Sequence, residues 1–273
     1  MDTTYSKNLG KKTDYISTYT PQLLDPIPRA RGRGNITACD SAAFSGYDLW
    51  TGYELSWLNP KGKPMVAVAE FMIPCTSPNL IESKSFKLYL NSLNQTAFVS
   101  EQELVETLIQ DLSATSGGDV QVKLIPVDET LESRADKSFT CIDDLDIEID
   151  SYGYDEDRLL GATSANTVEE KLCSHLLKSN CLVTNQPDWG SVYIHYQGAE
   201  IDRETLLRYI ISFREHNEFH EQCVERIFAD IKRCCNPEKL TVFARYTRRG
   251  GLDINPFRSD FEEAMLVGRE YRQ

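Results

Sequence analysis

The sequence predicts an α+β protein in which antiparallel sheets carry helices packed on one face. Stretches with the alternating pattern of strands surround stretches with the period of amphipathic helices, and this order of elements occurs twice in the 273 residues. A weak echo supports the repeat, because Tyr89 and Tyr209, and likewise Ser92 and Ser212, lie 120 positions apart. We therefore expect two copies of a strand-strand-helix-helix-strand unit.

The first copy is expected to contain a strand, a turn, a second strand, two helices and a last strand, at 48–58, 59–63, 65–73, 82–94, 100–116 and 120–125. Asn59, Pro60 and Gly62 supply the turn chemistry of a hairpin. Ser100, followed three residues later by Glu103, has the pattern of a capping box and so marks a helix start.

The second copy is expected to repeat this order at 172–182, 185–190, 192–196, 203–213, 219–231 and 240–247. The acidic link at 128–157 includes DDLDIEID at 143–150, which is either a solvated connection or a strand with polar edges. Residues 1–43, rich in Tyr, Thr, Pro, Gly and Arg, predict an irregular N-terminal arm. The two modules are then expected at 44–135 and 136–273.

Composition limits the classes of partner. Asp and Glu number 42 against 29 Lys and Arg, which gives a formal charge of −13 and disfavours direct binding to nucleic acid. No apolar run reaches the length of about 18 residues that a membrane span needs, and the N-terminus lacks the apolar core of a signal peptide. We therefore expect a soluble, cytoplasmic protein with no membrane partner. Exposed sheet edges invite pairing with a second copy, so a homodimer is expected.

The cysteines predict neither disulfides nor a metal site. A chain of this length without a secretory signal does not need a disulfide framework, so its eight cysteines are expected to be free thiols. No Cys-x-x-Cys pair occurs, and His216 and His220 have helical spacing without an HExxH motif.

The stretch ESKSFKLY combines two lysines, two serines and a glutamate. If Glu82 opens a helix, Lys84 and Lys87 lie on neighbouring ridges. The hydroxyls of Ser83 and Ser85 then lie beside the first free N–H groups, which suits an anionic ligand. The alternative is a capped helix with ordinary surface lysines.

Cys181 ends a predicted strand and enters a polar loop that contains proline, where a thiol is expected to be accessible. A cysteine nucleophile needs a nearby group that transfers protons, and Asp188 could fold back toward it across the turn. The alternatives are a cysteine of the core and an aspartate that forms a turn.

Two further segments could bind ligands. In HNEFHE, a carboxylate at a helix start could accept the N–H edge of a planar heterocycle, and Glu221 with His220 is better placed for this than Glu218. In RYTRRGG, arginines suit phosphate and glycines let the backbone approach it. The alternatives are a capping turn with solvated charges, and arginines that pair with surface carboxylates. No GxGxxG follows a strand, so a nicotinamide cofactor would bind outside a Rossmann fold.

Four motifs together, ESKSFKLY, NCLVTNQPDWGS, SFREHNEFHE and RYTRRGGLDINP, closely resemble the 7-cyano-7-deazaguanine reductases in their long, two-module form. The resemblance covers both halves in the family's order. It implies tandem tunnelling-fold (ferredoxin-like) modules that assemble through their sheets. It also implies the four-electron reduction of the nitrile of 7-cyano-7-deazaguanine to 7-aminomethyl-7-deazaguanine with two NADPH, in queuosine biosynthesis.

The resemblance further implies a role for residues at the motif positions. Cys181 would add to the nitrile carbon to give a covalent thioimide, and Asp188 would protonate its nitrogen. Substrate contacts would come from Ile81, Glu82, Ser83, His220 and Glu221. Cofactor contacts would come from Ser83, Lys84, Arg249 and Gly250. Which of Arg248 and Arg249, and which of Lys84 and Lys87, contacts the cofactor phosphates stays open.

Two functions of other classes also stay open. A zinc-dependent cyclohydrolase-like enzyme of the same fold would need zinc bound by cysteine and histidine, so metal content would distinguish it. A non-catalytic tandem-module binding protein would not need Cys181, so replacing that residue would distinguish it.

Overall fold

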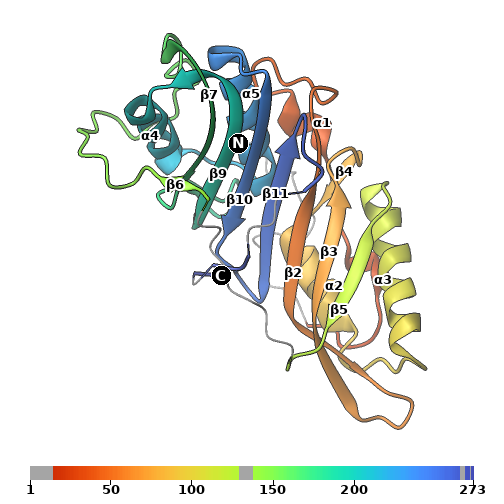
Figure 1. Ribbon diagram of the computed structural model, residues 1–273. Coiled ribbons are helices and arrows are strands. Elements are labelled where there is room, and N and C mark those ends of the chain that lie inside the picture. Colours follow the sequence, from red (N-terminus) through yellow and green to blue (C-terminus); the bar gives the residue numbers. More distant parts are fainter. Residues whose placement is uncertain (1–14, 129–137, 265–267, 271) are drawn as a thin grey trace. The chain divides into compact units, whose positions relative to one another are not determined.

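The computed structural model describes residues 15–128, 138–264, 268–270 and 272–273 (Figure 1). The chain divides into two compact units. The first unit draws on Met1–Arg31, Asp48–Leu131 and Arg248–Ile254, and the second on Gly32–Tyr47, Glu132–Thr247 and Asn255–Gln273. These units are groupings in space, whereas the predicted modules at 44–135 and 136–273 are divisions of the sequence, and their boundaries stay predictions.

The part of the predicted arm that is described contains short regular elements. These are η1 (Pro21–Leu23), β1 (Pro26–Pro28) and α1 (Arg29–Arg33). β1 pairs antiparallel with β4 (Asn79–Ile81). Arg29 forms a buried ion pair with Asp48, with Nη2 and Oδ2 2.5 Å apart. A strand pair and an ion pair therefore hold this part of the arm in the first unit.

The first unit contains strands in the order β5-β3-β2. Its main elements are β2 (Ser45–Leu58), β3 (Pro64–Pro74), α2 (Ser83–Ser92), α3 (Glu101–Ser116) and β5 (Gln121–Ile125). Figure 1 shows α2 and α3 on the same face of these strands. Every strand and helix predicted for the first half is therefore confirmed.

Local signals explain these boundaries. The hairpin between β2 and β3 closes with the Asn59 N–H donating to the Lys63 carbonyl at 2.9 Å, and Gly62 takes the left-handed conformation with φ of 76°. The Ser100 side chain caps α3 by accepting from the Glu103 N–H at 3.1 Å. Gly117 ends α3 in the left-handed conformation with φ of 75°.

Aromatic rings fill the space between the helices and strands of the first unit. Phe86 of α2 lies near both Trp50 of β2 and Phe71 of β3, with ring centroids 5.1 and 5.0 Å away. All three residues are almost fully buried. α3 adds three leucines at four-residue spacing, Leu104, Leu108 and Leu112.

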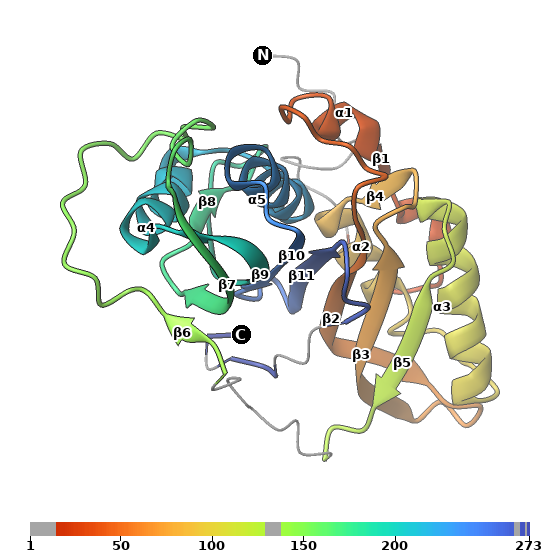
Figure 2. The same cartoon turned by 45° about the horizontal axis from the view of Figure 1, so that its top comes forward.

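The second unit contains strands in the order β11-β10-β9-β7-β6, and β8 pairs with β9. Its elements are β6 (Thr140–Cys141), β7 (Thr163–Ser174), β8 (Lys178–Asn180), β9 (Pro187–Ile201), α4 (Arg203–Ser212), η2 (Phe213–Glu215), α5 (His220–Cys235), β10 (Lys239–Tyr246) and β11 (Leu252–Ser259). Figure 2 shows α4 and α5 on the same side of the strands. The predicted α+β class with antiparallel sheets and packed helices is confirmed.

The second unit differs from expectation in its strands. The expected strand at 172–182 is two strands, the end of β7 and β8, and β7 begins at Thr163 in a polar, exposed stretch without apolar alternation. β9 begins at Pro187 and so includes residues expected to form a turn. Residues 143–150 form no strand, which leaves the solvated connection.

The sequence prediction also missed one strand, β11, because its last predicted strand was 240–247. Every residue of β11 is buried, the polar ones included, so the alternation of apolar and polar residues from Leu252 to Asn255 does not correspond to a buried and an exposed face. It also contains Pro256, which argues against a strand when the sequence is considered alone.

Equivalent residues of the predicted repeat form the same hydrogen bonds in both units. In the first unit the Tyr89 hydroxyl donates to Asp111 Oδ2 at 2.6 Å, which ties α2 to α3. In the second unit the Tyr209 hydroxyl donates to Asp230 Oδ2 at 2.6 Å, which ties α4 to α5. Ser92 and Ser212 donate to the carbonyls of these tyrosines, at 2.6 and 2.7 Å. The same tyrosine therefore locks the helix pair of each unit.

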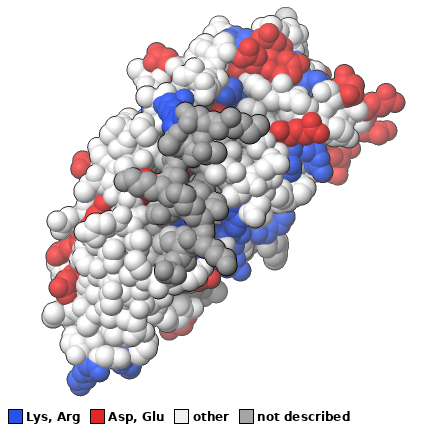
Figure 3. All heavy atoms as spheres, turned by 180° about the vertical axis from the view of Figure 1, so that it is seen from behind, with Lys and Arg blue, Asp and Glu red and all other residues white. Residues whose placement is uncertain are grey.

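Charged side chains are mixed on the face shown in Figure 3, where basic groups are small and separate and lie among acidic ones. This pattern is in keeping with the formal charge of −13. Among the described residues, no helix is both long and apolar enough to cross a membrane.

Glu225 of α5 neutralises two arginines inside the second unit. Its Oε1 lies 2.8 Å from Nη2 of Arg258 and 2.7 Å from Nη2 of Arg33. The side chains of Glu225 and Arg258 are 1% and 0% exposed. A carboxylate buried between two guanidinium groups cannot be removed without leaving those charges uncompensated.

We predict that Glu225→Gln lowers the free energy of unfolding by about 3–5 kcal/mol, the usual cost of breaking a buried ion pair from one side. Urea denaturation at pH 7 would measure the loss. Glu106→Gln is the matched control, because Glu106 is exposed on α3 and only accepts a bond from Gln102. An equal effect of the two substitutions would contradict the assignment.

Candidate functional site

One hairpin of the second unit brings Cys181 and Asp188 to the same face. β8 pairs antiparallel with β9, with Ser179 opposite Asp188. The pairing continues into the loop, because the Cys181 N–H donates to the Gln186 carbonyl at 2.8 Å. Side chains alternate between the two faces of a strand, so Cys181 projects on the same face as Ser179 and Asp188. The chain therefore folds back between the two residues as expected.

Cys181 is less accessible than the sequence suggested. It is 7% exposed, so the expectation of an accessible thiol was wrong. The loop closes on itself, with the Asn185 N–H donating to the Cys181 carbonyl at 3.0 Å. Asn217 Nδ2 donates to the same carbonyl at 3.3 Å and to Asn185 Oδ1 at 2.9 Å. The loop and the segment before α5 therefore cover this residue.

The Asp188 carboxylate lies against His220, the first residue of α5. Asp188 Oδ2 and His220 Nε2 are 3.3 Å apart, and both side chains are largely buried. The His220 ring stacks on Tyr246 of β10, with ring centroids 3.8 Å and planes 4° apart. His220 Nδ1 is buried, with no hydrogen-bond partner among the residues that the structure describes. The stacked ring thus directs one nitrogen to Asp188 and leaves the other for a ligand.

Asn180 fixes the hairpin to the segment that precedes α5. Its N–H donates to the His216 carbonyl at 2.8 Å, and its carbonyl accepts from the Glu218 N–H at 3.0 Å. Cys181 follows Asn180 directly, and His220 lies two residues after Glu218. These two main-chain bonds therefore set the position of Cys181 relative to His220.

Glu218 fixes this segment through hydrogen bonds to Arg226 of α5 and to His216. Arg226 donates to both of its carboxylate oxygens, at 2.7 and 2.9 Å, and His216 Nε2 lies 3.1 Å from Oε2. Burial alone would raise the pKa of Glu218, but the bonds from Arg226 and His216 outweigh it and hold that pKa below the usual glutamate value. Glu218 therefore serves the fold, which agrees with the preference for Glu221 as a ligand acceptor.

Glu221 occupies the first turn of α5 and is 4% exposed. The N-cap residue Phe219 offers no side-chain cap to this helix. A carboxylate in the first turn stabilises the partial positive charge at the start of a helix. Glu221 thus lies at a buried helix start. There its carboxylate could accept hydrogen bonds from the N–H edge of a heterocycle, as the sequence predicts.

In the first unit, Glu82 caps α2 with its own carboxylate. Oε1 accepts from the Lys84 N–H at 2.9 Å, and Oε2 accepts from the Ser85 N–H at 2.7 Å. Burial raises the pKa of Glu82 even though these two bonds lower it. The cap therefore occupies two of the N–H groups that were expected to suit an anion, and the anion site itself stays a prediction. An anion would have to be bound by side chains.

Such side chains are present beside the cap. Ser83 and Lys84 are half-buried in the first turn of α2, and Ile81 is buried at the end of β4. Lys87 lies one turn further on, with Nζ 3.5 Å from Glu54 Oε2.

The turn after β10 approaches this helix closely. A Cβ on Gly250 would lie 3.1 Å from Lys87 Nζ, and φ of Gly250 is 63°, so the turn suits glycine. The Arg249 N–H donates to the Leu252 carbonyl at 2.8 Å and closes the turn. Arg248 instead places its guanidinium 4.9 Å from the ring centre of Tyr53. Lys87 and the Arg249–Gly250 turn therefore meet, although the sequence left Lys87 as an open addition.

The predicted site residues fall into two groups. The second unit holds Cys181, Asp188, His220 and Glu221, and the first holds Ile81, Glu82, Ser83, Lys84, Arg249 and Gly250. In both groups, segments that are far apart in the sequence come together.

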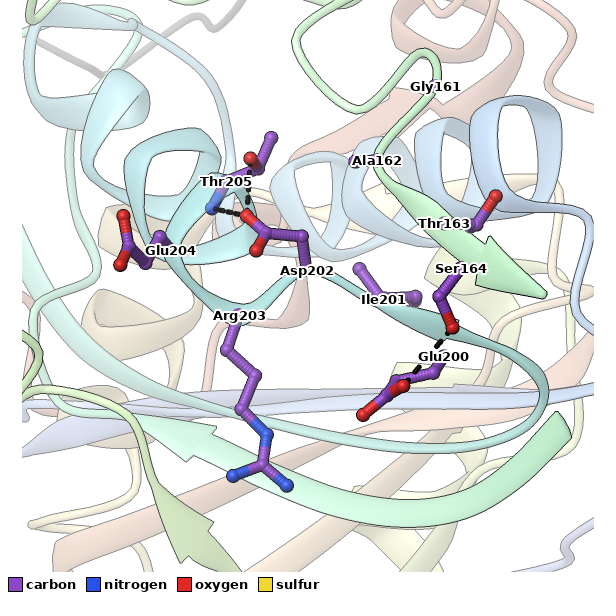
Figure 4. Close-up of a pocket in the computed structure, with 10 residues that line it drawn as sticks. All are labelled: Gly161, Ala162, Thr163, Ser164, Glu200, Ile201, Asp202, Arg203, Glu204 and Thr205. Carbon is purple, nitrogen blue, oxygen red and sulfur yellow. Dashed lines mark hydrogen bonds between the residues drawn. The ribbon is translucent and has the colours of Figure 1, made fainter. Parts of the chain in front are cut away.

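A pocket of about 680 Å³ opens at the start of α4 (Figure 4). It is lined by residues 161–164 and 200–205, and none of the predicted site residues lies among them. Asp202 caps α4 by accepting from the Thr205 N–H at 2.8 Å, as Glu82 caps α2. The second unit thus keeps the acidic cap of the repeat, with Arg203 and Glu204 following it in place of Ser83 and Lys84.

Sequence reasoning missed several residues of the second group. Tyr246 gave no signal, because a tyrosine in a buried strand looks like any core residue. Asn217 could have been found from its place in HNEFHE, between the residues already singled out. Arg226 lies on α5 eight residues beyond Glu218, a separation that only the folded chain explains.

Two family models match the chain. The model described as nitrile reductase, 7-cyano-7-deazaguanine-reductase N-term, matches residues 15–124, and the model described as QueF-like protein matches residues 187–265. The first match includes Ile81 to Lys84, and the second includes Asp188, His220, Glu221, Arg249 and Gly250. Cys181 lies in the stretch between the two matches.

Sixteen chains of solved structures match this chain. One is the crystal structure of the archaeosine synthase QueF-Like in the apo form, with 19% sequence identity and a TM-score of 0.31. The match covers 37% of this chain and 99% of that one. A likeness at this level establishes neither a shared reaction nor a shared substrate.

We predict that the bond pattern of Glu218 makes stability depend on pH. The folded-state pKa lies below the unfolded value of about 4.3, so the ionised carboxylate stabilises the fold above that pH, and this contribution is lost as the pH falls through the folded-state pKa. Glu218→Gln should lower the free energy of unfolding by about 3 kcal/mol at pH 7. In urea denaturation, the difference from wild type should shrink below about pH 4.

Glu215→Gln serves as the control, because Glu215 is exposed in the neighbouring η2. A loss for Glu218→Gln that stays constant from pH 7 to about pH 3.5 would contradict the ionic role of Glu218.

Proposed function

This chain belongs to the family of two-module, QueF-type nitrile reductases, and we propose that it reduces the nitrile of 7-cyano-7-deazaguanine to 7-aminomethyl-7-deazaguanine with NADPH. The observation that carries the proposal is the hairpin that presents Cys181 and Asp188 on one face, with Asp188 held by His220 at 3.3 Å. A thiol that attacks carbon and a carboxyl group that protonates nitrogen are the groups that nucleophilic addition to a nitrile uses. The proposal places this step in queuosine biosynthesis.

Cys181 is the proposed nucleophile. A nitrile accepts hydride poorly, whereas addition of a thiolate to its carbon gives a thioimide, whose C=N carbon accepts hydride once the nitrogen is protonated. In this step the S–C bond forms, one C–N π bond breaks and the nitrogen takes a proton. A first hydride and loss of the thiolate give an imine, and a second hydride gives the amine. Two hydrides and two protons complete the four-electron reduction.

Asp188 is the proposed proton donor to the nitrile nitrogen. Its side chain is 6% exposed, and His220 Nε2 lies 3.3 Å from its Oδ2. Stacking on Tyr246 holds the imidazole in one plane, so the carboxyl group keeps a defined direction. A fixed donor is favourable because proton transfer requires hydrogen-bond reach to the accepting atom.

Glu221 and His220 are proposed to hold the deazaguanine. A buried carboxylate can accept two N–H groups from the edge of the heterocycle, and His220 Nδ1 is directed to no described partner. Ile81, Glu82 and Ser83 are proposed as further substrate contacts. The carboxylate of Glu82 keeps lone pairs beyond the two that accept from α2, so capping and ligand contact are compatible.

Ser83, Lys84, Arg249 and Gly250 are proposed to bind NADPH, which supplies hydride when bound. The residues fit a phosphorylated group, because the Gly250 turn has no Cβ and lies against Lys87. Lys84, Lys87 and Arg249 supply positive charge for a phosphate group. Gly250 lets the main chain approach that phosphate closely.

The remaining properties are proposals as well. The acidic composition favours a free base as substrate over direct contact with RNA. A cytoplasmic homodimer, assembled through sheet edges, is proposed for the whole protein.

We predict that incubation with 7-cyano-7-deazaguanine without NADPH increases the intact mass of the chain by one substrate molecule. Cys181→Ala should abolish both this adduct and nitrile reduction, because the proposed adduct forms on the Cys181 thiol. Cys234→Ala is the control, since Cys234 lies at the end of α5 and is partly exposed. An unmodified wild-type chain, or a Cys181→Ala variant that still reduces the nitrile, would overturn the mechanism.

We further predict that Lys84→Gln raises the KM for NADPH at least about tenfold, because a charge-assisted bond to phosphate contributes roughly 1.5–3 kcal/mol. The KM for the nitrile should change little. Lys61→Gln, in the exposed turn between β2 and β3, is the matched control and should behave as wild type. Steady-state kinetics with each substrate varied in turn would measure both constants, and an unchanged KM for NADPH would remove Lys84 from the cofactor site.

A further inference from the structure

Three metal-binding side chains meet at the edge of the second unit, away from the residues discussed so far. They are Cys141 of β6, Cys173 of β7 and His175, and one ligand atom from each lies within 4.8 Å of the other two. β6 and β7 pair in parallel with Cys141 opposite Cys173. His175 follows Cys173 by two residues, directly after the end of β7 at Ser174. The cluster is thus a product of strand register.

Cys141 and Cys173 are free thiols on paired strands. Neighbouring strands lie about 4.8 Å apart, so both thiols can reach one metal ion. Two thiolates on one tetrahedral zinc ion lie about 3.8 Å from sulfur to sulfur, because each Zn–S bond is about 2.3 Å long. Side-chain rotation alone can bring ligand atoms within 4.8 Å of each other to that spacing.

The surroundings of His175 match those of a metal-bound imidazole. Its Nδ1 lies 2.8 Å from Ser191 Oγ, and Ser191 in turn donates to Glu270 Oε2 at 2.7 Å. Metal-bound histidines almost always use their second ring nitrogen in such an outer hydrogen bond, which orients the ring. Nε2 is then the nitrogen that would bind the metal.

Asp143 lies beside the cluster, although its carboxylate is not within 4.8 Å of all three ligand atoms. Its Oδ2 accepts from the His175 N–H at 2.8 Å, which holds the carboxylate beside the cluster. Its Oδ1 is buried, with no hydrogen-bond partner among the residues that the structure describes. A buried carboxylate oxygen without a partner is costly unless a cation or a donor satisfies it.

We propose that Cys141, Cys173 and His175, with Asp143 as fourth ligand, bind one zinc ion that fastens the segment around β6 to β7. Two thiolates, an imidazole and a carboxylate form a donor set that suits tetrahedral Zn²⁺. β6 has only two residues and its cysteine is exposed, so the strand pair itself contributes few bonds. The ion would bind the folded state and thereby stabilise it. Cys181 takes no part, which separates this site from a zinc-dependent active site.

The test is a metal titration of the full chain, treated with chelator and kept reduced. Co²⁺ reports thiolate ligands through charge-transfer absorption in the near ultraviolet, and competition with Zn²⁺ gives stoichiometry and affinity. We expect one equivalent of metal in the wild-type chain and a rise in Tm on adding Zn²⁺. Cys141→Ser and His175→Ala should each weaken binding at least about tenfold and lose the rise in Tm.

Cys234→Ser and Cys181→Ser are the matched controls and should bind metal as the wild type does, because neither residue belongs to the cluster. Circular dichroism would establish that each variant is folded. Absence of thiolate absorption in the wild type would overturn the proposal, as would binding that survives Cys141→Ser or is lost in Cys181→Ser. Nitrile reduction is not measured in this experiment, so its outcome is independent of the proposed function.

Discussion

The site of the second unit depends on the two main-chain hydrogen bonds of Asn180. One element of the site is a hairpin loop and the other is the start of a helix, and loops of this kind have little rigidity of their own. The N–H and carbonyl of Asn180 bond to residues on both sides of Asn217, at 2.8 and 3.0 Å, so the loop and the helix start behave as one piece. The ion pair of Glu218 with Arg226 then anchors that piece to α5. The proposed chemistry at Cys181 would therefore be supported by residues that do not themselves react.

The two units share a scaffold and differ in what they place on it. Tyr89 with Asp111, and Tyr209 with Asp230, lock equivalent helix pairs with bonds of equal length. Each unit also opens its first long helix with an acidic cap, Glu82 or Asp202. Beyond the caps the units diverge, since lysines and a glycine turn occur in one and a thiol, carboxylates and an imidazole in the other. This division explains why the motifs of the family are spread over both halves of the sequence.

Much of the fold could be predicted because its signals are local. The capping box of Ser100, the hairpin turn at Gly62 and the leucine spacing of α3 each need only a few neighbouring residues. β11 was missed because Pro256 interrupts its sequence pattern and argues against a strand when the sequence is considered alone. The predicted site residues came from motifs, and a motif does not show how deeply a side chain is buried, so the sequence interpretation wrongly expected an accessible thiol at Cys181. The cluster of Cys141, Cys173 and His175 was invisible for a related reason, since its ligands meet only through strand register.

The discontinuity of the first unit has a consequence for synthesis of the chain. The unit begins in the N-terminal part of the chain, yet it includes Arg248–Ile254, and the Tyr53 N–H donates to the Gly251 carbonyl at 2.9 Å. A ribosome must therefore add roughly two hundred residues between these partners before the bond can form, and contacts of such long separation are slow to close. During that interval the N-terminal strands are exposed to solvent and to other nascent chains. Translation speed and chaperone supply, rather than the final stability of the fold, would then govern how much of this protein a cell recovers in active form.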